Sequence, residues 1–156
     1  MTIAGLPLHI LVVHGVVVFV PLTVLASIAL AVLPRWRWLS RWPTAVMSVI
    51  SVGLAFLATT SGESLEESRP QLRRIVHEHS ERGGVLANLT IVLAVVVLAA
   101  AYLLPGPTAL ESGRGEVASR VALADKVLPV LLVLVAVVVA VQLVLTGDSG
   151  ARAVWG

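Results

Sequence analysis

The chain has 156 residues and a mass of 16.4 kDa, and 58% of its residues are hydrophobic whereas only 13% are charged. Ordinary soluble domains are about 45–50% apolar and about 25% charged, so this composition excludes a soluble globular protein. The chain contains no cysteine, which excludes disulfides, thiolate metal sites and cysteine-based catalysis. Its net charge of +2 arises from basic residues scattered among short polar segments, so nothing predicts nucleic-acid binding.

Long apolar stretches predict an integral membrane protein made of one domain, residues 1–156. Each stretch is close to the roughly 17–25 residues that a membrane-spanning helix needs. The four stretches run from about Leu8 to Leu33, Pro43 to Thr60, Gly84 to Leu104 and Lys126 to Thr146. The predicted fold is therefore all-α, a four-helix transmembrane bundle in a multi-pass protein of the plasma membrane, with the lipid bilayer around it.

Proline and glycine mark the predicted helix ends. Pro34 and Pro43 bracket the first connection, and Gly147 follows the fourth apolar stretch. Before the third stretch, Pro70 occupies a first-turn position where its missing N–H is harmless, and apolar residues then recur at helical spacing. We therefore expect the third helix to begin near Pro70, with amphipathic outer turns beyond the hydrocarbon.

The distribution of basic residues predicts the orientation in the membrane. The short loop after the first stretch interleaves three arginines with three tryptophans, which is typical of a cytoplasmic interface, and the loop after the third stretch adds basic residues to the same side. These basic residues are Arg35, Arg37, Arg41, Arg114, Arg120 and Lys126. Because an even number of spans returns the chain to the side where it began, both termini are predicted on the extracytoplasmic side.

All the histidines fall at two places that this topology puts on the same side of the membrane. His9 and His14 lie at the start of the first helix, and His77 and His79 lie at the outer end of the third. Imidazole is the commonest metal ligand, and an ionisable group is costly to bury in a membrane. These side chains are therefore the first functional candidates.

Helical geometry distinguishes the histidines from one another. At about 100° per residue, His77 and His79 point roughly 200° apart, and His79 shares the apolar stripe that we expect to face the bundle. His14 lies deeper in the membrane than His9, and a polar group there needs a partner or a ligand. His14 and His79 are therefore the strongest candidates for a site in the bundle interior.

Two histidines from facing helices at similar depth are what bis-imidazole ligation of haem requires. We therefore predict a b-type haem-binding membrane protein in electron transfer or a redox-accessory role, with His14 and His79 as axial ligands. Gly15 and Gly83 are predicted to contribute to the same site, because a glycine lets a flat ligand or a neighbouring helix approach closely.

Two other interpretations remain open at this point. In one, His9, His14, His77 and His79 hold Zn or Cu near the outer surface, which requires a non-helical chain around His77. In the other, the protein is a non-redox accessory subunit of a membrane complex, or associates with further copies of itself. The spans contain no Asp or Glu and no nucleophile–base pair, which argues against a proton-coupled transporter or an intramembrane protease. The residues therefore do not favour an enzyme.

A stripe of mainly small residues runs along the second predicted helix and favours close contact between helices. It comprises Ala45, Ser48, Ser51 or Val52, Ala55, Ala58 or Thr59, and Gly62. Asn88 and Gln142 have hydrogen-bonding side chains inside spans, so we expect both to face other helices.

Several short motifs, spread from one end of the chain to the other, are similar to those of a known family. They are Gly5–His9 followed by His14, Ser61–Glu63, His77–Glu81 and the tail Thr146–Gly156. These motifs resemble a bacterial family of small four-helix membrane proteins that is catalogued as a domain of unknown function. The resemblance implies the four-helix fold, a bacterial inner membrane and a histidine function facing the periplasm, with haem binding as one candidate.

Overall fold

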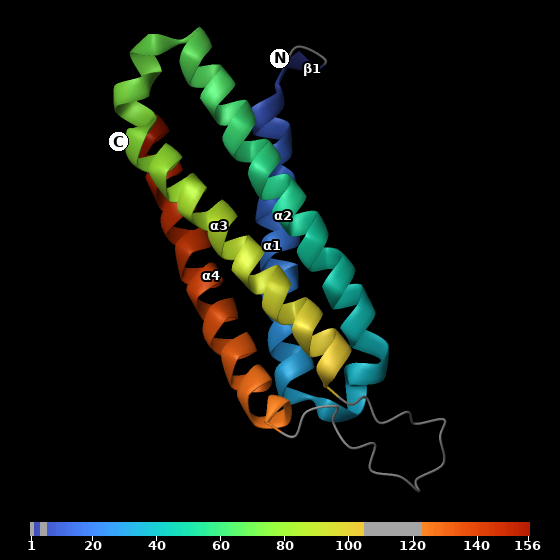
Figure 1. Cartoon of the computed structure of the whole chain (residues 1–156). Helices are drawn as coiled ribbons and strands as arrows, with labels where there is room; N and C mark the ends of the chain where they lie inside the picture. The colour runs from blue at the N-terminus through green and yellow to red at the C-terminus, as the bar shows by residue number, and fades with distance from the viewer. Residues whose placement is uncertain (1, 4–5, 105–122) are drawn as a thin grey trace, which may run out of the picture.

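The computed structural model describes residues 2–3, 6–104 and 123–156, and these residues form a bundle of long helices (Figure 1). The helices are α1 (Leu8–Val32), α2 (Arg37–Ser68), α3 (Arg73–Leu103) and α4 (Ala124–Trp155). Within the described part of the chain, these four helices are long and apolar enough to cross a membrane. The predicted all-α fold of spanning helices is therefore confirmed.

Short elements precede and connect the helices. Two-residue strands, β1 (Thr2–Ile3) and β2 (Leu6–Pro7), pair antiparallel before α1. The one-turn 3-10 helices η1 (Pro34–Trp36) and η2 (Pro70–Leu72) make the turns between α1 and α2 and between α2 and α3. Each 3-10 helix has its proline in the first turn, where no backbone N–H is needed. Arg114, Arg120 and Gly5, which the sequence analysis singled out, lie outside the described residues.

Two helices are longer than the sequence predicts. α2 begins at Arg37 and includes Pro43, and α4 continues through Gly147 to Trp155. A glycine lowers helix stability by only about 1 kcal/mol relative to alanine, which contacts with a neighbouring helix offset. A membrane helix likewise tolerates a proline, because neighbouring groups satisfy the freed carbonyl. The third helix begins as expected, since η2 starts at Pro70 and leads into α3.

Helices that follow one another in the chain run antiparallel and pack side by side, and α4 closes the bundle against α1 (Figure 1). The start of α1, the η2 turn and the end of α4 therefore lie at one end of the bundle. We call this the outer end, after the predicted orientation. The opposite end, with η1 and the start of α4, is the inner end.

The inner half of the bundle has a dense core of aliphatic and small side chains from all four helices. Its largest fully buried members are Val20, Leu30, Leu93, Val97, Leu132 and Val139. On α2, Ala45, Ser48, Ser51 and Ala55 are buried, so the predicted small-residue stripe does face the neighbouring helices. Small side chains let the backbones approach closely, which is how helices associate in a membrane.

A buried arginine closes the inner end. The Arg37 side chain is 7% exposed. Its Nε donates to the carbonyl of Leu30 at 3.0 Å and its Nη2 donates to the carbonyl of Ala31 at 3.1 Å. These carbonyls belong to the last turn of α1 and have no partner within the helix, so Arg37 caps α1.

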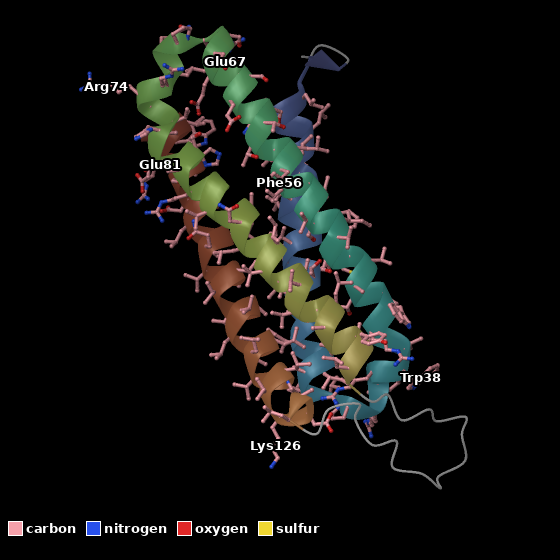
Figure 2. All side chains as sticks on the ribbon, viewed as in Figure 1. Trp38, Phe56, Glu67, Arg74, Glu81 and Lys126 are labelled. Atoms are coloured by element: carbon pink, nitrogen blue, oxygen red, sulfur yellow. The ribbon has the colours of Figure 1, made fainter. Side chains whose placement is uncertain are left out.

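The outside of the bundle is covered by large apolar side chains. Leu25, Val46, Val95 and Leu134 are each more than half exposed. The charged side chains labelled in Figure 2 lie toward the two ends, whereas Phe56 lies between them. An apolar belt between charged ends is the surface that a bilayer requires.

The two amide side chains that were predicted to face other helices, Asn88 and Gln142, behave differently. The side-chain Nε2 of Gln142 donates to the carbonyl of Arg82 on α3 at 3.0 Å, so Gln142 faces another helix as predicted. The same prediction is wrong for Asn88, which is exposed on the outside of α3. Ala87 and Thr90 take the inward positions on that turn and are buried.

Candidate cofactor site

A cavity of about 740 Å³ lies between the helices in the outer half of the bundle. Ligand sites in proteins commonly have volumes of about 300–1,000 Å³, so this space suits a cofactor-sized molecule. All four helices line it, mainly with aliphatic side chains such as Val13, Leu86 and Leu143. Few polar side chains line the cavity, and two of them are histidines.

His9 and His79 line the cavity from different helices. His9 lies in the first turn of α1 and His79 lies in the second turn of α3. Their ring centroids are 6.3 Å apart and their ring planes meet at 82°. The prediction that the two groups of histidines lie at the same end of the bundle is therefore confirmed, and so is the inward position of His79.

Backbone carbonyls orient both imidazole rings. Nδ1 of His9 lies 2.9 Å from the carbonyl oxygen of Ala58 on α2, and Nδ1 of His79 lies 2.9 Å from that of Thr146 on α4. A carbonyl oxygen only accepts, so the neutral rings carry their hydrogen on Nδ1 and keep the lone pair on Nε2. Among the described residues, Nε2 of neither ring has a hydrogen-bond partner. Histidines that bind metals are oriented in this way.

Two glycines make room for the rings. A Cβ atom on Gly62 would lie 3.2 Å from Cε1 of His9, and a Cβ atom on Gly150 would lie 2.9 Å from Cε1 and Nδ1 of His79. By contrast, a Cβ atom on Gly53, which lies outside the cavity, would meet nothing within 4 Å. Gly62 and Gly150 are therefore part of the site. Sequence reasoning placed Gly62 only in the small-residue stripe and Gly150 only in the tail motif.

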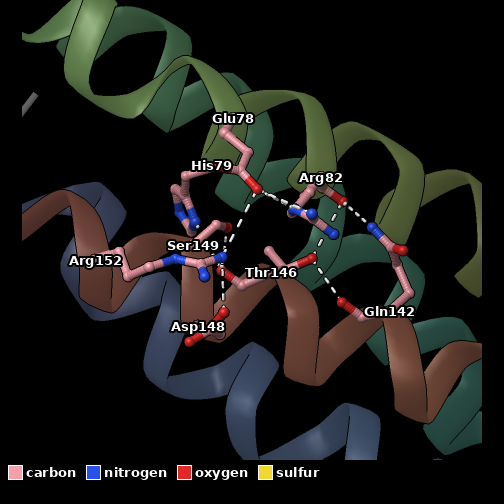
Figure 3. Close-up of polar contacts among 8 residues, drawn as sticks. All are labelled: Glu78, His79, Arg82, Gln142, Thr146, Asp148, Ser149 and Arg152. Carbon is pink, nitrogen blue, oxygen red and sulfur yellow. Dashed lines mark hydrogen bonds and ion pairs between the residues drawn. The ribbon is translucent and has the colours of Figure 1, made fainter. Parts of the chain in front are cut away.

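A polar network holds α4 against α3 at the level of His79 (Figure 3). The Thr146 hydroxyl lies 3.2 Å from the carbonyl of Arg82 and 2.8 Å from that of Gln142. The Ser149 hydroxyl donates to the Thr146 carbonyl at 2.9 Å, so this oxygen accepts from both Ser149 and His79. The polar tail that follows the fourth apolar stretch thus fixes the oxygen that orients His79.

Ion pairs extend this network toward the outer end. Arg152 contacts Asp148 at 2.8 Å and Glu78 at 3.8 Å, and Glu78 also contacts Arg82 at 2.9 Å (Figure 3). The participating side chains are partly exposed, so each pair contributes at most about 1 kcal/mol. The ion pairs help to explain why α4 stays helical past Gly147.

The structure does not bring His14 and His79 together. His14 is exposed on the outside of α1, does not line the cavity, and has its Nδ1 2.6 Å from the carbonyl of Ile10 in its own helix. Five residues rotate a helix by about 140°, so an inward His9 turns His14 away. Gly15 lies close to α2 instead, where an added Cβ would be 3.1 Å from the Leu54 side chain.

Of the other predicted site residues, Gly83 lies at the cavity and His77 lies outside it. Gly83 lines the cavity one turn after His79. His77 is exposed on the outer face of α3 and lies 3.4 Å from Glu81, so it is turned away from the cavity. Across the described ranges, no three histidine or acidic side chains lie close enough together to hold a metal ion.

These features define a multi-pass membrane protein with an apolar cavity that contains two oriented histidines. The family model described as "Predicted membrane protein (DUF2231)" matches residues 5–156, so the chain belongs to this family. The resemblance seen in the sequence motifs is thereby confirmed at the level of the family. The chain matches no curated protein and no solved structure.

Proposed function

We propose that the protein binds one haem b between His9 and His79 and serves as an electron-transfer or redox-accessory protein of the membrane. The observation that supports this most directly is the pair of imidazoles, 6.3 Å apart in an apolar cavity, each with its Nδ1 on a carbonyl. The proposed pair keeps His79 from the sequence prediction and replaces His14 by His9.

The donor set suits haem better than a bare metal ion. Zn needs about four ligands, whereas two imidazoles face this cavity and no larger cluster exists among the described residues. A porphyrin supplies its own four nitrogens and leaves two axial positions for histidine. A metal held between two imidazole nitrogens at about 2.0–2.1 Å each separates the ring centroids by roughly 6 Å. The spacing of His9 and His79 agrees with this value.

When bound, haem supplies one-electron exchange, and the chain's residues set the conditions for it. The carbonyls of Ala58 and Thr146 accept from Nδ1 of the two rings, so each neutral ring keeps its hydrogen on Nδ1 and its lone pair on Nε2. Val13, Leu86 and Leu143 contribute to an apolar wall that excludes water. Because the site lies at the outer end, it is within reach of redox partners in or beside that face of the membrane.

The test uses the full chain purified in mild detergent and loaded with haem. We expect a sharp low-spin spectrum in the oxidised and dithionite-reduced states at about one haem per chain. His9→Ala and His79→Ala should each abolish this spectrum. His14→Ala and His77→Ala are the matched controls and should retain it, because both side chains lie outside the cavity.

Two results would overturn the proposal. One is a wild-type protein that takes up no haem. The other is a haem spectrum that survives both His9→Ala and His79→Ala, since haem would then be bound elsewhere or dissolved in the detergent.

A further inference from the structure

One arginine at the cavity rim has no hydrogen-bond or ion-pair partner for its side chain among the described residues. Among the described residues, Arg82 and Arg152 form ion pairs, whereas Arg69, Arg73 and Arg74 form none. Of these three, Arg69 lines the cavity. Arg73 and Arg74 border a separate shallow groove on the outside of the η2 turn, beside His77.

The position of Arg69 relates it to the histidine site. It directly follows α2 and comes seven residues after Gly62, the glycine that makes room for His9. Seven residues are about two helical turns, so Arg69 follows Gly62 on the same side of the chain, roughly 10 Å further out. The cation therefore lies on the cavity side, between the imidazoles and the aqueous phase.

We propose that Arg69 binds the carboxylate edge of the ligand and so fixes its orientation, an inference that rests on the proposed function. Haem b is apolar except for two propionate carboxylates on one edge. A guanidinium group matches a carboxylate in shape and charge and binds it through two hydrogen bonds. The structure thus assigns the site to porphyrins with an anionic edge, held with that edge outward.

Two acidic residues at the same rim sharpen this assignment. Glu63 and Glu66 also line the cavity, and neither forms an ion pair with Arg69. The guanidinium is therefore available to a ligand. The two carboxylates repel an anionic edge, so Arg69 is the rim residue that compensates this repulsion.

The test compares two ligands that differ only at the carboxylates, haem b and its dimethyl ester. Each is titrated into the full chain in detergent at low salt, and the Soret band reports the Kd. We expect Arg69→Gln to weaken haem binding by about tenfold while leaving ester binding unchanged. Arg73→Gln, in the next turn of the chain but outside the cavity, should change neither. Glu66→Gln should act in the opposite direction and tighten haem binding alone.

The outcomes separate this inference from the proposed function. If the wild type forms no low-spin complex with either porphyrin, both proposals fail. If both porphyrins bind and Arg69→Gln weakens them equally or not at all, the histidine site stands and the role of Arg69 is refuted. Only a loss confined to the free carboxylates supports it.

Discussion

The two halves of the bundle use the same four helices in different ways. In the inner half, Leu30, Leu93 and Leu132 are almost completely buried and the helices are in close contact. In the outer half, the helices surround a cavity of about 740 Å³ with His9 and His79 inside it. The comparison shows how a small membrane protein combines a stable fold with an open site: one half is packed, and the other is held open around polar groups.

The halves also use polar groups differently. In the inner half, the buried Arg37 side chain donates its hydrogen bonds to backbone carbonyls of α1 and stabilises the fold. In the outer half, the carbonyls of Ala58 and Thr146 take one nitrogen of each imidazole and leave the other available. Substitutions in the inner half should therefore change stability, whereas those in the outer half should change ligand binding.

The largest expected effect is on the packed core. Leu132→Ala removes a fully buried side chain and should lower the free energy of unfolding in detergent by about 2–5 kcal/mol. The haem spectrum of the folded protein should not change. Leu134→Ala is the control, because Leu134 is 59% exposed on the outside and should cost much less. An equal loss for both variants would contradict the packing contrast.

The second effect concerns the space around His79. In Gly150→Ala the new methyl group would lie 2.9 Å from the imidazole and displace it. Overpacking costs about 1–3 kcal/mol, so haem affinity should fall by roughly five- to 150-fold with little loss of stability. Gly53→Ala, on the exposed face of α2 with open space around it and outside the cavity, should leave haem affinity unchanged. The same spectrophotometric titration measures both variants.

The third effect tests the closure of the inner end. Arg37→Gln removes hydrogen bonds to the carbonyls of Leu30 and Ala31. Leaving buried acceptors unpaired should lower the free energy of unfolding by about 1–2 kcal/mol and leave haem affinity as it was. Arg35→Gln is the control, because Arg35 is exposed and should have little effect. A loss of haem affinity in Arg37→Gln would show that the two halves are coupled.

The smallest effect is expected for the exposed ion pairs of α3 and α4. Arg152→Gln breaks contacts with Asp148 and Glu78 among side chains that are more than half exposed. The free energy of unfolding should fall by less than about 1 kcal/mol, and the difference should shrink in high salt. Haem affinity should stay within about twofold, because Thr146 keeps its own bonds to α3. A tenfold loss would mean that the ion pairs position His79.

The fold could be predicted from the sequence because its signal is long-range composition. Apolar stretches of spanning length, separated by charged turns, cross a bilayer as helices. The starts of α1 and η2 were predictable from Leu8 and Pro70. The end of α4 was not predictable, because contacts of Thr146 and Arg152 with α3 stabilise a helix that local sequence would end at Gly147. Propensity is a weak guide where tertiary contacts compete with it.

The site could be predicted only in part, for a geometric reason. α3 has charged residues near His79, so its inward face is readable from the sequence. The start of α1 is apolar on all sides, so nothing local indicates whether His9 or His14 faces inward. That choice depends on how α1 packs against α2, including the fit of Gly15 against Leu54. Nothing in the local sequence indicates that Gly62 and Gly150 make room for the histidine rings, because a glycine shows only that the position is small.

The most direct test of the central claim is the low-temperature EPR spectrum of the oxidised, haem-loaded protein. Two imidazoles on one ferric haem give a low-spin spectrum, and nearly perpendicular rings give the strongly anisotropic form with a large gmax. The 82° angle between the rings of His9 and His79 predicts that form. A high-spin ferric signal, or a loaded spectrum identical in His79→Ala, would contradict the account.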